Sequence, residues 1–196
     1  RGDLHARGTR AAAAAVDVTV KAAAELRERS DIRFDLFGQG QTKARAMALA
    51  DELDLSNIHF HDPVPKAEVP GLIAGADAMV MTLFRSPLIH IYFENKFIDY
   101  MGSGKPIIAA MGGHQAEIIE RREVGRVVPS FDHIGLAKLI AEAADNPESF
   151  VEMGHRGQQL VRERLLLPDI LDRYCSVVEG VANGTAASIP AWEPVP

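Results

Sequence analysis

The segment from Glu94 to Pro106, which reads ENKFIDYMGSGKP, holds the residue types best suited to chemistry in this sequence. Lys96 supplies a cation and Asp99 a carboxylate one turn later, so the two are predicted to share one side of a short helix. An ionised carboxylate only accepts hydrogen bonds, which suits Asp99 to the paired hydroxyls of a ribose. A lysine in the first helical turn opposes the helix dipole, which favours an anionic partner over the alternative of a solvated lysine.

The other residues of this short helix are expected to pack against the protein. Phe97, Ile98 and Met101 form an apolar stripe, whereas Tyr100 is predicted on the polar side of the helix. The two glycines and the proline that follow end the helix before an apolar run, IIAA, which indicates a buried strand. The segment is therefore predicted to be a loop, a short helix, a tight turn and a strand.

Turns that contain glycine or charged residues follow several apolar runs. The carboxyl ends of parallel strands meet at one edge of a sheet, where free backbone N–H groups bind anions such as a diphosphate. Arginine and lysine side chains add charge-assisted hydrogen bonds to such a ligand. Besides Lys96 and Asp99, the residues expected at this edge are Gly8, Thr9, Arg10, Gly38, Gly40, Arg85, Glu94, Asn95, Gly112, Gly113 and His114.

None of these turns is diagnostic by itself. Gly38 and Gly40 lack the third glycine of the nicotinamide fingerprint, so a plain strand-to-helix turn and a nucleotide contact are equally open. For His114, at the start of a helix on the ligand side, both contact with the ligand and exposure to solvent remain possible.

His59 and His61 have no third ligand at metal-site spacing, so we expect solvated loop histidines and no metal. A serine hydrolase is disfavoured because G-x-S-x-G does not occur.

Strand-like and helical patterns alternate along the chain without hairpin signals. Strands are predicted over residues 4–7, 31–37, 58–60, 78–83, 107–110 and 125–128. Besides the short helix after Glu94, helices are predicted over residues 11–29, 42–53, 66–74, 115–122, 134–144, 148–164 and 169–180. This order predicts an α/β fold with a Rossmann-like, doubly wound parallel sheet of about six strands over residues 1–165. A C-terminal helix (166–181) and an irregular tail (182–196) are expected to follow.

Composition limits the classes of function. The chain has 196 residues, 47% of them hydrophobic, and a net charge of −6 that argues against a nonspecific nucleic-acid partner. Its single cysteine, Cys175, excludes an internal disulfide, fits a cytoplasmic location and is expected to be buried on a helix. No apolar run approaches the roughly 20 residues that span a bilayer, and no signal peptide is recognised. Because the chain starts at Arg1 without a methionine, we expect a fragment of a longer protein.

Six stretches, taken in order, resemble the C-terminal, donor-binding half of GT-B glycosyltransferases of family 4. They are GTRAAAAAVD (8–17), FDLFGQG (34–40), ADAMVMTL (76–83), ENKFIDYMGSGKPIIA (94–109), GGHQAEII (112–119) and VGRVVP (124–129). The fourth stretch is the most specific, because it is close to the P-N-K-x-F-E-Y-M-x-x-G-x-P block of one subset of that family.

The resemblance implies a half-enzyme that binds a UDP- or GDP-linked sugar as substrate and uses no cofactor. Asp99 would replace the ribose-binding glutamate of the family, Arg10 and Lys96 would act catalytically on the leaving diphosphate, and the base would lie near the turn at 38–40. The whole enzyme would transfer the sugar, with retention, to a lipid-linked or other glycan acceptor in polysaccharide synthesis, in the cytoplasm or at the inner face of the membrane. An N-terminal acceptor domain would be missing, the fragment alone would be inactive, and the last helix would expose an apolar surface toward that domain.

Several residues depart from the family pattern. Ile91 stands in place of the first glutamate of the usual pair, Glu94 in place of a common proline, and Ala11 in place of a glycine. Two alternatives stay open: a sugar-nucleotide epimerase of the same fold, and a degenerate module that binds a nucleotide or a partner protein without catalysis, which the departures at Ile91 and Ala11 favour. Binding of one nucleotide that depends on Asp99 would distinguish the transferase from the interaction module.

Overall fold

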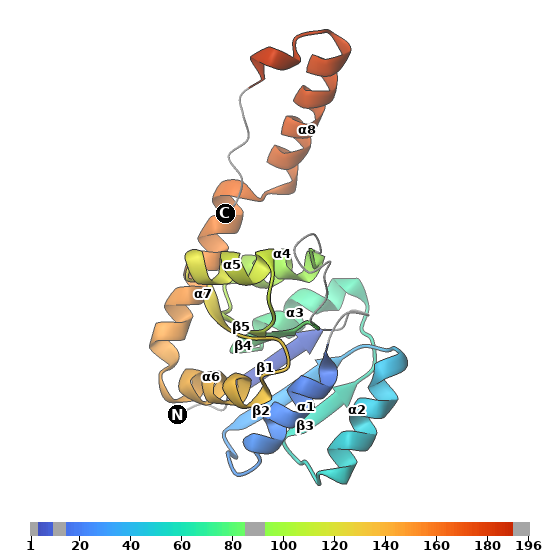
Figure 1. The fold of residues 1–196 in the computed structure, drawn as a ribbon, viewed down its shortest axis with the longest axis vertical. Coiled ribbons are helices and arrows are strands. Elements are labelled where there is room, and N and C mark those ends of the chain that lie inside the picture. Colours follow the sequence, from blue (N-terminus) through green and yellow to red (C-terminus); the bar gives the residue numbers. More distant parts are fainter. Residues whose placement is uncertain (1–3, 10–14, 85–92, 190–196) are drawn as a thin grey trace.

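A single parallel sheet forms the centre of the protein in the computed structural model, which describes residues 4–9, 15–84 and 93–189. Its six strands lie in the order β3-β2-β1-β4-β5-β6 (Figure 1). The predicted doubly wound parallel sheet is thus confirmed. The strands are β1 (Leu4–Thr9), β2 (Ile32–Phe37), β3 (Ile58–His61), β4 (Ala78–Thr82), β5 (Ile107–Ala110) and β6 (Gly125–Val128).

Helices cover both faces of this sheet. The first face packs against α1 (Val16–Glu25), α2 (Gln41–Glu52) and α6 (His133–Asp145). The second face packs mainly against α3 (Val69–Ala74), α4 (Asn95–Gly102), α5 (His114–Arg121) and the end of α7 (Pro147–Arg164). All residues of β4 and β5 are buried, which explains their continuous apolar runs, because alternate side chains enter the two cores. A short 3-10 helix, η1 (Lys66–Glu68), precedes α3.

The helix predicted over 11–29 ends earlier than expected, at Glu25. The side-chain amide of Asn57 donates to the carbonyl oxygens of Ala23 and Leu26 at 2.9 and 3.2 Å. These bonds satisfy carbonyl groups that a longer helix would have used internally, so a distant side chain ends the helix. The first part of that prediction, residues 11–14, lies outside the described residues.

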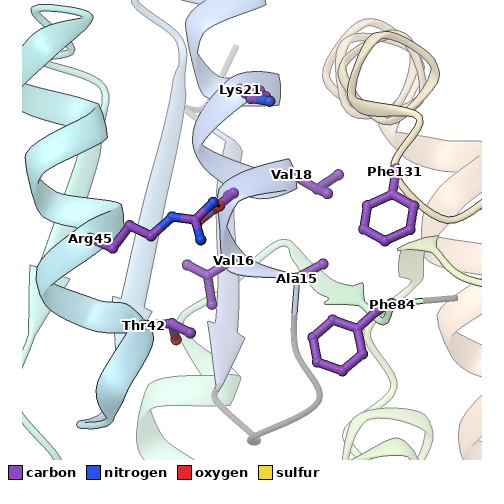
Figure 2. Close-up of a pocket in the computed structure, with 9 residues that line it drawn as sticks. Ala15, Val16, Val18, Lys21, Thr42, Arg45, Phe84 and Phe131 are labelled. Atoms are coloured by element: carbon purple, nitrogen blue, oxygen red, sulfur yellow. The ribbon is translucent and has the colours of Figure 1, made fainter. Parts of the chain in front are cut away.

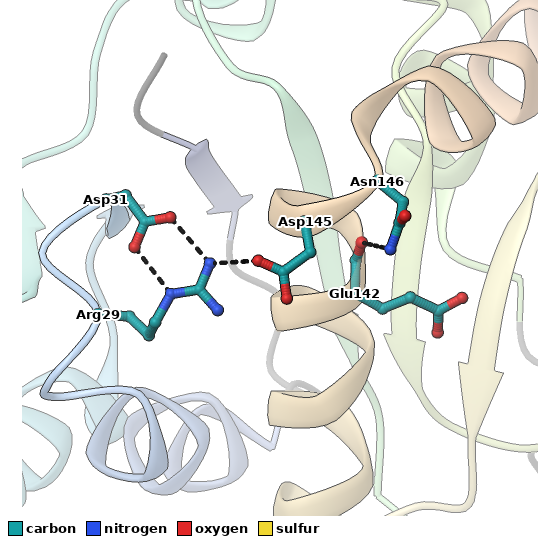
Figure 3. Close-up of polar contacts among 5 residues, drawn as sticks. All are labelled: Arg29, Asp31, Glu142, Asp145 and Asn146. Atoms are coloured by element: carbon teal, nitrogen blue, oxygen red, sulfur yellow. Dashed lines mark hydrogen bonds and ion pairs between the residues drawn. The ribbon is translucent and has the colours of Figure 1, made fainter. Parts of the chain in front are cut away.

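An arginine ties the turn after α1 to the end of α6. Arg29 donates two hydrogen bonds of 2.8 Å to Asp31 and one of 2.9 Å to Asp145 (Figure 3). The hydrogen bonds that Arg29 donates to the two carboxylates raise its pKa, so the guanidinium stays charged. The three side chains are 31–60% exposed, so this cluster aligns the two segments more than it stabilises the fold.

The last long helix, α8 (Leu167–Ala182), projects away from the sheet and its covering helices (Figure 1). Of its described residues only Gly180 is buried. The exposed apolar side chains of α8 are Leu167, Leu171, Tyr174, Val177, Val178 and Val181. Cys175 is also exposed, so the expectation that it is buried is wrong: among the described residues, α8 is exposed along most of its length. The tail beyond it includes a second 3-10 helix, η2 (Ala186–Ser188).

No helix in the described part of the chain combines the length and apolar character that a bilayer crossing requires.

Candidate functional site at the carboxyl edge of the sheet

Helix α4 begins at the carboxyl edge of the sheet, because it connects β4 to the parallel strand β5. Its first cap residue, Glu94, has an extended backbone, and its carbonyl oxygen accepts the N–H of Phe97 at 2.9 Å. Asn95 and Asp99 are exposed on this helix. The first residue of α4 and the Asp99 side chain are therefore both exposed near this edge.

Tyr100 is 1% exposed and belongs to the second core, so its prediction on the polar side of α4 is wrong. Phe97 and Met101 are buried as expected, and Ile98 is half-buried. The helix lies between the sheet and α7, so it buries a wider surface than one stripe.

Lys96 and Glu94 form an ion pair inside this site. The Lys96 Nζ lies 3.5 Å from Oε2 of Glu94, and the two side chains are 11% and 6% exposed. Burial lowers the pKa of Lys96, and the neighbouring Glu94 carboxylate offsets part of that change. The cation predicted to meet a diphosphate is therefore already placed against a carboxylate of its own chain.

Gln115 fastens the beginning of α4 to the beginning of α5. Its amide oxygen accepts the backbone N–H of Glu94 at 3.1 Å, and its amide nitrogen donates to the carbonyl oxygen of Glu94 at 3.2 Å. The side chain is 1% exposed. Gln115 was not predicted as a site residue, because no signal in the sequence distinguishes it from an exposed glutamine on a helix.

The turn before α5 presents three of the predicted residues. Gly113 has φ +82°, which favours glycine, and it is the cap residue of α5. Gly112 is half-buried, and a Cβ at that position would meet nothing within 4 Å. The His114 Nδ1 lies 3.8 Å from Oε2 of Glu117, and its side chain is 43% exposed. This turn lies beside the start of α4, because Gln115 joins the two.

The turn after β2 is held by β3 through one carbonyl group. Gly38 and Gly40 have φ of +136° and +149°, conformations that glycine adopts readily. The Gly38 N–H donates to the His61 carbonyl oxygen at 3.2 Å, and Lys43 Nζ donates to the same oxygen at 2.9 Å. Lys43 also pairs with Asp62 at 3.0 Å. The predicted base-side turn is thus fixed by two donors to one backbone oxygen.

The histidines of β3 are not solvated loop residues, so that expectation is wrong. His59 and His61 lie on the strand and are half-buried; burial, followed by nearby Arg33, lowers the pKa of His59. His61 Nε2 lies 2.6 Å from Oδ1 of Asp35, and its ring stacks on Phe37 at a centroid distance of 4.4 Å. The strand register places Phe37 opposite His61, which a single sequence cannot reveal.

Asp35 is the centre of this second cluster. Arg33 donates two hydrogen bonds to its carboxylate, at 3.0 and 2.9 Å, and the Asp35 side chain is 4% exposed. Burial raises the pKa of Asp35, but the hydrogen bonds from Arg33 and His61 outweigh it and lower the pKa below its usual value.

A hollow of about 370 Å³ lies near the same edge, beside the first turns of α1 (Figure 2). Phe84 and Phe131 face it from one side of α1, and Arg45 approaches from α2 on the other side. Arg45 forms an ion pair with Asp17 in the first turn of α1. The described residues that line the hollow include none of the predicted site residues. Phe131 has φ +71°, a conformation that is rare for a bulky side chain.

Arg10 and Arg85 lie outside the described residues, and for Gly8 and Thr9 only the strand backbone is described, where Thr9 pairs with Phe37. Among the residues that the structure describes, no group of three His, Cys, Asp or Glu side chains could hold a metal ion.

Comparisons with known proteins identify the family. A family model described as "Glycosyl transferases group 1" matches residues 5–146. A comparison with curated proteins finds no match. The family match agrees with the resemblance noted in the sequence.

Solved structures share the fold. HepE from Anabaena in complex with UDP is 16% identical with a TM-score of 0.79, and the match covers 91% of this chain and 49% of that one. Sucrose-phosphate synthase from Thermosynechococcus elongatus is 18% identical with a TM-score of 0.79, over 93% of this chain and 46% of the other. TarM from S. aureus, in complex with UDP among other ligands, is 14% identical with a TM-score of 0.76, over 89% and 35%. The chain thus spans between a third and a half of the length of these structures.

Proposed function

Because this chain belongs to the group 1 glycosyl transferases, we propose that it is the donor-binding half of an enzyme that transfers a sugar from a nucleoside diphosphate to an acceptor. The observation that carries the proposal is the placement of α4. Its N-terminus lies at the carboxyl edge of the sheet, and Asp99 is exposed although Phe97 and Tyr100, its neighbours in the helix, are buried. The neighbours HepE and TarM, both solved with UDP, support a uridine nucleotide as the first ligand to test.

Different residues of the site bind different parts of the nucleotide. Asp99 accepts hydrogen bonds from the ribose hydroxyls, because an ionised carboxylate can take two O–H donors. The first turns of α4 and α5 direct backbone N–H groups at the diphosphate, and Lys96 adds a positive charge. The turn at Gly38 and Gly40 lies on the side of the base.

The transfer breaks the bond between the anomeric carbon and a diphosphate oxygen, on which negative charge then develops. A site that lowers this barrier must hold positive groups where the charge appears. Lys96 and the start of α4 meet that requirement, and Arg10 is proposed to join them. We expect transfer with retention at the anomeric carbon.

The acceptor side of the enzyme is proposed to lie in a second, N-terminal domain that contacts α8. The exposed apolar residues of α8 recur at helical spacing, from Leu167 through Leu171 and Tyr174 to Val178 and Val181. The helix carries three acidic residues and one arginine, so an anionic membrane surface is a poorer partner than a protein domain. A fragment without that domain binds the donor and transfers nothing.

Calorimetric titration of this chain with UDP, GDP and ADP tests the proposal. We expect saturable binding of one nucleotide, weakened about tenfold or more by Asp99→Ala, because two hydrogen bonds to a charged group are lost. Asp51→Ala removes an exposed acid from α2 and serves as the matched control.

The 2′-deoxy form of the bound nucleotide makes the test specific for the ribose. Wild-type protein should prefer the ribonucleotide, and Asp99→Ala should reduce that preference. If none of the three nucleotides binds, the chain is an interaction module instead of a donor-binding domain. If Asp99→Ala binds like the wild type, Asp99 does not hold the ribose.

A further inference from the structure

The Glu94–Lys96 pair has a feature that donor binding alone does not explain. A site for an anionic diphosphate is expected to keep carboxylates away, because like charges repel strongly where water is excluded. Here the carboxylate of Glu94 is 6% exposed and lies 3.5 Å from the lysine that the ligand needs. Glu94 is also the cap residue of α4, directly before the N–H groups expected to bind the diphosphate.

Glu94 is held in this place by its backbone. Gln115 makes two hydrogen bonds with the N–H and C=O of Glu94, so the main chain of Glu94 is fixed between α4 and α5. Rotation about the side-chain torsions of Glu94 and Lys96 can change the contact between them while the backbone of Glu94 stays in place. The pair can therefore separate without moving the helix.

We propose that Glu94 is an internal competitor of the donor diphosphate. Its carboxylate pairs with Lys96 while no donor is bound, and the diphosphate replaces the carboxylate as the partner of Lys96 when it binds. This inference rests on the proposed function, since it assigns a role within the same site. Burial gives a physical reason for this exchange, because a buried ammonium group needs a nearby anion. The Glu94 carboxylate is that anion before the donor binds, and the diphosphate takes its place afterwards.

The competition weakens the binding of every diphosphate, including the nucleoside diphosphate that remains after transfer. A site without Glu94 would hold this product more tightly and release it more slowly. Glu94 is therefore assigned as a residue that sets affinity for the diphosphate, and it acts through Lys96.

The test measures the affinity of this chain for UDP and for uridine, which has no phosphate. Glu94→Gln should lower the dissociation constant for UDP about tenfold and leave that for uridine unchanged. Lys96→Met should raise the constant for UDP and leave that for uridine unchanged. Glu120→Gln removes an equal charge from the exposed part of α5 and should change neither constant.

A double-variant cycle separates competition from simple repulsion. If Glu94 acts by holding Lys96, Glu94→Gln improves UDP binding much less in the Lys96→Met background than in the wild type. Equal improvement in both backgrounds would overturn the proposal, as would unchanged or weaker binding of UDP by Glu94→Gln alone.

A second variant, Glu94→Asp, provides a control in case Glu94→Gln fails to fold. Glu94→Asp keeps the charge and the N-cap position but withdraws the carboxylate by one methylene, so it should also tighten UDP binding, by a smaller factor. If Glu94→Gln does not fold, Glu94→Asp decides the matter, and unchanged UDP affinity then refutes the competition. Wild-type protein that binds none of UDP, GDP and ADP refutes the proposed function itself, a result distinct from either of these.

Discussion

Replacing Asp35 by asparagine tests whether the cluster on β2 and β3 stabilises the sheet edge. The Asp35 carboxylate is 4% exposed and receives two hydrogen bonds from Arg33, besides its 2.6 Å contact with His61. Hydrogen bonds to charged groups contribute about 1.5–3 kcal/mol each. Arg33 is 44% exposed, so water replaces part of its contribution, and an asparagine oxygen can still accept one bond.

We therefore expect Asp35→Asn to lower the free energy of unfolding by about 2 kcal/mol at neutral pH. For a chain of this length, that change corresponds to a melting temperature lower by about 4–8 °C. Thermal and urea unfolding followed by circular dichroism measure both quantities. Asp62→Asn is the matched control, because Asp62 is 89% exposed and its pair with Lys43 should contribute less than about 1 kcal/mol.

The effect of Asp35→Asn on stability should also depend on pH, in a direction that follows from the pKa of Asp35. The pKa of Asp35 is lower in the folded protein than in the unfolded chain, where it is about 3.9. The charged carboxylate thus stabilises the fold fully above about pH 4 and loses this effect as the pH falls through the folded pKa. The difference between wild type and Asp35→Asn should shrink in acid. Equal stability of the two at neutral pH, or a difference that grows in acid, would refute the reasoning.

Two further predictions concern packing. Gly125→Ala should destabilise the protein by about 3 kcal/mol or more, because the added Cβ would lie 2.0 Å from the carbonyl oxygen of Ile107. Gly71→Ala in α3 should be neutral or stabilise the protein by up to about 1 kcal/mol, because the added Cβ would meet nothing within 4 Å. Urea unfolding compares the two, and similar losses would contradict the steric argument. The double variant Leu171→Glu with Tyr174→Glu should keep the melting temperature within about 2 °C, since both residues are exposed on α8. A larger drop in a thermal melt would show that α8 packs against the body of the protein in solution.

The sequence predicted the sheet well because its signals are local. The run AMVMT at β4 is apolar at every position, and a strand covered on both faces requires that pattern. The breaks at Gly38 and Gly113 lie where the backbone adopts positive φ, so glycine marked both turns. The end of α1 was misplaced because Asn57, from a distant part of the chain, terminates it.

The candidate site was less predictable because its contacts cross between elements. Lys96 and Glu94 are two residues apart, a spacing that does not bring side chains together within a helix. They meet because Glu94 stands before the helix in an extended conformation. Tyr100 was misplaced because helical spacing does not reveal how far the second core extends around α4. The pairing of Asp35 with His61 depends on strand register, and Gln115 on the distance between two helix starts.

The close contact between α7 and the C-terminal end of α4 links the ligand edge to the projecting helix. A Cβ at Gly154 of α7 would lie 2.1 Å from the carbonyl oxygen of Gly104, and one at Gly157 would lie 3.4 Å from the Cα of Met101. Only two residues separate α7 from α8. Gln115 thus holds the residue before α4, and α7 packs against the C-terminal end of α4 before the chain bends and continues into α8 (Figure 1). A domain that binds α8 would therefore lie two residues along the chain from the helix that packs against α4, the helix that carries Lys96 and Asp99.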